Sequence, residues 1–122
     1  MIVHNKPFEA FADGIVTVYS VVNIAEEGDR PRDGLRKLLS LPFDYKTVGI
    51  SRYTRGMQDN AKIAAVISVP LSPQVSTQNV VIIGDTQYSI WQVQRIMDTR
   101  PPTLKLSLEK VVENYEFENP KV

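Results

Sequence analysis

The sequence predicts a mainly β fold: a small antiparallel β-barrel with one short helix and a long inserted loop. The first observation behind this prediction is Gly84-Asp85, which separates two runs rich in β-branched and aromatic residues and favours a type II′ hairpin turn. The second is the stretch 103–111, where Leu alternates with Lys, Ser and Glu at the period of a half-buried strand. Several strands of this kind, joined by short turns, are expected to close or nearly close a barrel and so protect their edges.

The hairpin around Gly84-Asp85 sets the register of its two strands. A two-residue loop pairs residue 83 with residue 86 and residue 81 with residue 88. One face of the hairpin is therefore expected to lie in the core, and it consists of Val81, Ile83, Tyr88 and Ile90.

Length and composition fit a single domain, because the chain has 122 residues, no net charge and 43% hydrophobic residues. We expect an N-terminal arm at 1–14, the β-barrel domain at 15–112 and a C-terminal tail at 113–122. The absence of cysteine excludes a disulfide framework and a thiolate nucleophile. No apolar run approaches the roughly 18 residues of a membrane span, and no signal peptide is recognisable, so we expect a cytosol-like compartment and no membrane partner.

The first predicted strand, Ile15–Asn23, is apolar on both faces. Ile15, Tyr19 and Val21 lie on one face, and Val16, Val18 and Val22 lie on the other. Either one face packs inside while the other meets another subunit, or both faces are covered within the domain. The arm that precedes this strand is expected to be disordered or to lie on a neighbour.

The next stretch, Ile24–Pro42, is predicted to be a long insertion loop with equal numbers of acids and bases. Within it, Asp33 could cap a short helix that ends at Pro42. Unpaired buried ions cost several kcal/mol each, so the loop must face water. The charged residues are Glu26, Glu27, Asp29, Arg30, Arg32, Asp33, Arg36 and Lys37.

The middle of the chain returns to strand composition after this insertion. The expected elements are a strand at Phe43–Ile50, one or two helical turns at Ser51–Asn60, a strand at Ala61–Val69, a loop at Pro70–Asn79 and a turn at Asp98–Pro102.

The sequence offers no set of residues for catalysis. His4 is the only histidine, which excludes a His-based triad or a two-His metal site within one chain. Glu26 and Glu27 lie in a charge-rich loop, where their pKa values would not be driven apart as acid–base catalysis requires. The glycine spacing matches no phosphate-binding loop. We therefore expect no enzyme activity, no cofactor and no metal.

Trp91 is the one aromatic side chain that the predicted core does not explain. On a regular strand it lies opposite Tyr88 and Ile90, together with Val93 and Met97. Either a bulge changes the face after Ile90, or this side of the strand meets another chain.

The order of these motifs resembles the head closure family, the head–tail joining or connector proteins of long-tailed bacteriophages. The segment 47–53, TVGISRY, is similar to the family's small-Val-Gly-x-Ser segment before a short helix. The segment 84–90, GDTQYSI, resembles the family's Gly, polar residues and Tyr-Ser-Val/Ile. A terminal Leu-x-Leu-x-Leu-Glu strand follows at 104–109, and the resemblance spans about residues 15–112.

This resemblance implies a structural virion protein at the head–tail interface, assembled in the cytoplasm of the bacterial host. Its subunits would form a dodecameric ring that extends the portal and adaptor channel and provides a docking surface for the tail terminator or tail tube protein. DNA would pass through the ring without sequence-specific binding, and balanced charge agrees with such passage. The eight charged insertion residues would line the channel and help retain DNA. The residues expected at the subunit interface are Val16, Val18, Val22, Trp91 and Val93.

Two other functions remain open from the sequence. One is a tail terminator or another joining ring. The other is a small nucleic-acid-binding barrel of OB type, in which Arg52, Tyr53, Arg55 and Trp91 would contact single strands.

Overall fold

The computed structural model describes residues 10–46 and 63–118 of the chain. These residues form one seven-stranded sheet and no helix. None of the described residues belongs to a helix long and apolar enough to cross a membrane. The strands are β1 (Gly14–Asn23), β2 (Asp33–Tyr45), β3 (Ile63–Pro70), β4 (Asn79–Ile83), β5 (Thr86–Ile96), β6 (Thr103–Lys110) and β7 (Glu116–Phe117).

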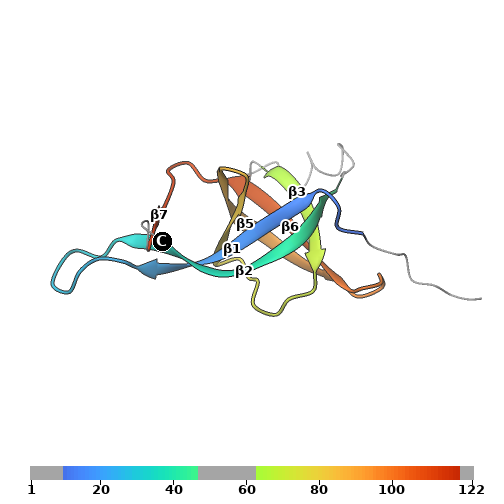
Figure 1. Cartoon of the computed structure of the whole chain (residues 1–122), viewed down its shortest axis with the longest axis horizontal. Helices are drawn as coiled ribbons and strands as arrows, with labels where there is room; N and C mark the ends of the chain where they lie inside the picture. Colours follow the sequence, from blue (N-terminus) through green and yellow to red (C-terminus); the bar gives the residue numbers. More distant parts are fainter. Residues whose placement is uncertain (1–9, 47–62, 119–122) are drawn as a thin grey trace, which may run out of the picture.

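Six of these strands form a ring of hydrogen-bonded neighbours. The order along the sheet is β1-β4-β5-β6-β3-β2-β7, and β1 pairs with β2 as well, which returns the sheet to its first strand. All pairs within the ring are antiparallel, whereas β7 adds to β2 in parallel. Figure 1 shows the strands curving around one another, with the β1–β2 hairpin extending to one side.

The core lies inside this ring and is entirely apolar at its centre. Alternate residues of β1, β3, β4, β5 and β6 point inward, as expected for strands with one covered face. The central side chains are Val16, Val18, Phe43, Ile67, Val69, Val75, Val81, Ile90, Leu104, Leu106 and Leu108.

The predicted hairpin register is confirmed. Ile83 pairs with Thr86 and Val81 pairs with Tyr88 across Gly84-Asp85. Gly84 has a φ of +62°, and no non-glycine residue in the described part of the chain has a positive φ. A type II′ turn needs a positive φ only at its first central residue, so it fits this pair. The alternation in β6 is confirmed too, because all three of its leucines are buried.

A β-bulge follows Ile90, as one of the two interpretations of Trp91 expected. Ile90 pairs with Leu108 and Gln92 pairs with Ser107, so that Trp91 is the extra residue on β5. Beyond the bulge, Val93 faces Leu106 and packs against the core. Trp91 itself stays 45% exposed.

The prediction of a loop and a short helix in residues 33–42 is wrong. These residues belong to β2, which pairs with β1 from Gly14 to Asn23, and the connection is only 24–32. Leu38 is an extra residue on β2, opposite the step from Val18 to Tyr19 on β1, and it interrupts the alternation of inward and outward side chains. The interrupted spacing of the leucines resembles that of a helix. Pro42 is tolerated because no described strand pairs with β2 there other than β1. The helical turns expected at Ser51–Asn60 lie outside the described residues.

Both ends of the described chain are tied to the sheet. The Asp13 N–H donates to the Phe43 carbonyl at 2.9 Å, and the Tyr45 N–H donates to Asp13 Oδ2 at 2.8 Å. At the other end, β7 lies in the predicted tail and pairs with Gly34 and Leu35. Chain segments on both sides of 15–112 therefore take part in the fold.

Candidate functional site: the β1–β2 arm

The outer part of the β1–β2 hairpin projects from the ring of strands. We name residues 19–37 the arm: the end of β1, the loop 24–32 and the start of β2. β1 pairs with β4 only from Thr17 to Ser20, and β2 pairs with β3 only at Asp44 and Tyr45. The arm therefore continues as a two-stranded ribbon beyond the ring, and Figure 1 shows it extending away from the other strands.

The loop of the arm is closed by hydrogen bonds at its base. Asn23 Oδ1 accepts the N–H groups of Ala25 and Arg32, both at 3.0 Å, and the Ile24 N–H donates to the Arg32 carbonyl at 2.8 Å. At the tip, the Asp29 N–H donates to the Glu26 carbonyl at 2.9 Å. These bonds give the charged tip a defined shape.

Gly34 provides space for the side chain that anchors this loop. A Cβ atom at position 34 would lie 2.5 Å from Cγ2 of Ile24, closer than real contacts allow. Ile24 therefore packs directly on the backbone of β2. This contact fixes the loop on one face of the ribbon.

A two-stranded ribbon is marginal in water, and the C-terminal segment supports this one. β7 adds a third strand beside Gly34 and Leu35, and the Glu118 N–H donates to the Leu35 carbonyl at 2.8 Å. The ring of Phe117 packs edge-on against Tyr19, with centroids 5.5 Å apart. Leu35 is only 2% exposed as a result.

Two ion pairs join the same segment to the arm. The Arg36 Nε donates to Glu118 Oε1 at 2.9 Å, and Arg36 Nη2 donates to the second carboxylate oxygen. These hydrogen bonds lower the pKa of the Glu118 carboxyl and raise the pKa of the Arg36 guanidinium. Arg32 Nε lies 3.5 Å from Glu116 Oε2. Arg32 and Arg36, the two bases of the arm beside the C-terminal segment, are therefore each paired with a carboxylate.

The eight predicted channel residues occupy three different settings. Glu26, Glu27, Asp29 and Arg30 are exposed in the loop, as expected for a charged tip. Arg32 ends the loop in its ion pair with Glu116. The remaining three, Asp33, Arg36 and Lys37, are exposed on β2 and belong to a strand rather than a loop.

The predicted interface residues are not all on the surface. Val16 and Val18 have no exposed area and lie in the core, contrary to the expectation of an outward face. Val22 is half-buried on the arm, and Val93 packs inward beyond the bulge. Trp91 is exposed, and so are other large apolar side chains that the prediction did not include: Ile15, Leu38, Tyr45, Met97, Val112 and Phe117.

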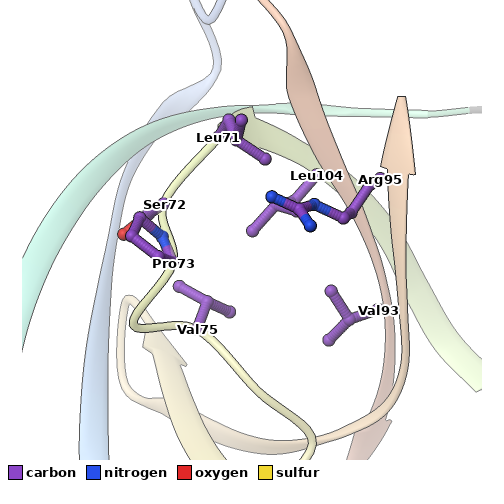
Figure 2. A pocket seen from close by; sticks show the side chains of 7 residues that line it. All are labelled: Leu71, Ser72, Pro73, Val75, Val93, Arg95 and Leu104. Carbon is purple, nitrogen blue, oxygen red and sulfur yellow. The ribbon is translucent and has the colours of Figure 1, made fainter. Parts of the chain in front are cut away.

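A cavity of about 220 Å³ opens between β5 and the segment that joins β3 to β4. Figure 2 shows Leu71, Ser72, Pro73 and Val75 on one side and Val93, Arg95 and Leu104 on the other. The walls are mainly aliphatic, and the guanidinium of Arg95 supplies the one charge. No sequence pattern predicted this cavity, because it depends on the bulge that places Val93 and the exposed Arg95 on its lining.

No three His, Cys, Asp or Glu residues within 10–46 and 63–118 lie close enough to hold a metal ion. The sequence did not predict that Gln87 binds the backbone of the C-terminal segment, or that Glu116 and Glu118 pair with bases of the arm. The alternation of aromatic and acidic residues in YEFE, 115–118, was the available signal for a short strand.

No protein-family model matches the chain, and no curated protein is significantly similar to it in sequence.

Proposed function

We propose that the chain is a structural subunit of a ring in the neck of a long-tailed bacteriophage. In this proposal the six-stranded ring is a small β-barrel, and about twelve copies surround a channel that extends the portal and adaptor. The ring lets DNA pass without gripping it, helps retain the packaged DNA and provides a docking surface for the tail terminator or tail tube. It performs no catalysis and resides in the virion after assembly in the host cytoplasm.

The observation that carries the proposal is the arm: a rigid, charged hairpin that projects from a closed body. A projecting hairpin held by a third strand, a buried leucine and two ion pairs can keep its charged residues at a fixed place in a ring. The tip bears charges of both signs, so it can remain in water without strong attraction to a phosphate backbone. The resemblance of the motifs at 47–53, 84–90 and 104–109 to head closure proteins supports the same function.

Exposed apolar side chains support an assembled state. Ile15, Trp91 and Met97 are each about half exposed, although the central core is filled. Such side chains would be covered if these parts of the surface met other subunits.

No observation favours the OB-type alternative over the ring. Arg52, Tyr53 and Arg55 lie outside the described residues, and Trp91 stands on a bulge next to uncharged Gln92. The tail terminator alternative shares the ring and differs only in its neighbours.

The proposal is tested by shortening the tip. Replacing residues 25–31 with an Asn-Gly turn removes the exposed charges but keeps every residue of β1 and β2. Particles that carry this variant should assemble heads but lose packaged DNA before the tail attaches. A matched variant with Asp29→Asn and Arg30→Gln keeps the length of the loop together with Glu26 and Glu27, and it should retain DNA. Full DNA retention with the shortened tip would reject the gating part of the proposal.

A further inference from the structure

The cavity beside β5 adjoins a strand edge that lacks a neighbour in the described chain. β5 pairs with β4 only from Thr86 to Ser89, whereas it pairs with β6 as far as Ile96. Beyond Ser89 the segment 71–78 faces β5 across the cavity instead of pairing with it (Figure 2). In an antiparallel pair, alternate residues direct their N–H and C=O groups away from the partner strand. These backbone groups are therefore available to a segment that enters from outside.

Arg95 gives this opening a specific chemical preference. Its side chain lines the cavity beside Leu104 in Figure 2, and it forms no ion pair with any residue of the described ranges. A guanidinium at the rim of an aliphatic cavity favours a carboxylate, because the apolar walls reduce competition from water. The opening therefore fits a segment that carries an acidic side chain.

The tip of the arm has the complementary charge. The two bases nearest the tail, Arg32 and Arg36, are matched by Glu116 and Glu118. The rest of the loop then holds three carboxylates, Glu26, Glu27 and Asp29, against the single base Arg30. Its net charge is −2, and none of these four side chains forms an ion pair within the described chain.

The arm and the Arg95 cavity cannot meet within one chain. Figure 1 shows the arm at one end of the molecule and the end of β5 toward the other. A contact between unlike ends of two copies is heterologous, and it generates a closed ring when the rotation between copies closes.

We propose that the Arg95 cavity receives the acidic tip of a second copy, in which Glu26 or Glu27 pairs with Arg95. This inference rests on the proposed ring for the arrangement of copies and names the contact that joins them. It also gives the tip a second role: in the ring it holds the neighbouring subunit.

Site-directed cysteines test this contact, because the chain has no cysteine of its own. One full-length copy carries Ala25→Cys in the tip, and another carries Ser72→Cys in the cavity wall. Under mild oxidation the mixture should form a disulfide-linked heterodimer, identified by mass spectrometry. A copy with Lys110→Cys, an exposed position outside the cavity, should link to the tip copy at least tenfold less.

Charge reversal separates the proposed pair from unspecific contact. Arg95→Glu in the cavity copy should reduce the yield of the Ala25–Ser72 link about tenfold, as for the loss of a close charge pair. Adding Glu26→Lys and Glu27→Lys to the tip copy should restore the link with this reversed cavity. Lys105→Glu serves as the control, because Lys105 pairs with Gln94 on the other face of β5 and β6 and should leave the yield unchanged.

Three results would overturn the inference: a yield no greater than with Lys110→Cys, a yield insensitive to Arg95→Glu, or a link that appears only after residues 1–9 are removed. The last result would assign the cavity to that segment of the same chain. Rings seen by electron microscopy without the link would reject this contact and leave the proposed function intact. The link without any ring would reject the proposed function and leave the contact intact.

Discussion

Gln87 and Tyr115 exchange two hydrogen bonds between the side chain of one and the backbone of the other. The Tyr115 N–H donates to Gln87 Oε1 at 2.8 Å, and Gln87 Nε2 donates to the Tyr115 carbonyl at 3.1 Å. The side-chain amide of Gln87, which is only 5% exposed, thus takes the place of a neighbouring strand. This pair holds the start of the segment that supports the arm.

Replacing Gln87 should release that segment without unfolding the ring of strands. In Gln87→Leu both backbone groups of Tyr115 lose their partner, and we expect a loss of about 1–3 kcal/mol in the free energy of unfolding. Urea unfolding measures this loss, and hydrogen exchange at the Tyr115 and Glu118 amides locates it. Gln92→Leu, on an exposed part of the same strand, is the control and should change neither quantity. Unchanged exchange at Glu118 in Gln87→Leu would mean that β7 is held by the arm alone.

Acid should detach the C-terminal segment from the arm. The pKa of Glu118 is lower in the folded chain than in the unfolded one, because Arg36 donates hydrogen bonds to the carboxylate. The contact therefore stabilises the fold above the ordinary carboxyl pKa of about 4.3, and this contribution is lost as the pH falls through the lower folded value. Arg36 is exposed and Glu118 is only partly buried, so the effect is local rather than global.

Nuclear magnetic resonance can follow this detachment through the contact between Phe117 and Tyr19. The ring-shifted resonances of the two aromatic rings should move toward unfolded positions as the pH decreases below about 4. In Glu118→Gln the same resonances should show no such titration. An identical titration in both proteins would show that Glu118 is not the group responsible for the pH response.

Truncation of Trp91 should lower the free energy of unfolding much less than truncation of Leu106. Trp91→Ala removes a side chain that is 45% exposed, so the isolated subunit should lose less than about 1 kcal/mol. Leu106→Ala leaves a cavity at the centre of the core and should cost about 2–5 kcal/mol. Denaturant unfolding of both variants provides the comparison. A Trp91→Ala subunit that unfolds like Leu106→Ala would place Trp91 in the core and remove it from any interface.

The main effect of Trp91→Ala should appear in assembly rather than in the stability of the subunit. If Trp91 lies at a subunit contact, Trp91→Ala should weaken association by about 2 kcal/mol or more per contact, although the subunit remains folded. Sedimentation of the variant at increasing concentration measures this effect. Association equal to that of the unchanged chain would exclude Trp91 from the contact.

Proteolysis should distinguish the tip from the strands that carry it. Glutamyl endopeptidase is expected to cut the free subunit after Glu26 or Glu27, because both lie in an exposed loop. Trypsin should cut slowly at Arg36 and Lys37, which are paired with β1. In an assembled ring the cuts at Glu26 and Glu27 should become slow as well, and mass spectrometry of the fragments shows which bonds are cut. Rapid cutting there in the ring would contradict a docked tip.

Local patterns predicted the second half of the sheet and failed in the arm. Alternation and a single glycine define β4, β6 and the first half of β5, because their paired residues follow a period of two up to the bulge at Trp91. β2 was mistaken for a loop and a helix because the bulge at Leu38 disrupts that period and its charges are paired with a distant segment. The Arg36–Glu118 contact spans 82 positions, so no local pattern contains it. Likewise, the buried state of Val16 and Val18 depends on how the sheet closes, since both faces of β1 are apolar in the sequence.

Salt dependence provides the sharpest contrast with a nucleic-acid-binding protein. A protein that contacts several phosphates loses affinity steeply as salt rises, because bound counterions are released on association. The chain has no net charge, so we expect no shift of short single-stranded oligonucleotides at about 0.15 M salt. Tight binding at low salt that decreases by orders of magnitude with added salt would favour the OB-type function instead.

Electron microscopy of phage particles that carry a gold-labelled copy of the chain is the most direct test of the proposed function. The account predicts label at the head–tail junction, in a ring around the DNA channel, and rings of the same diameter in preparations of the purified protein with its neck partners. Particles without label at the neck, together with a purified chain that remains monomeric beside those partners, would contradict it.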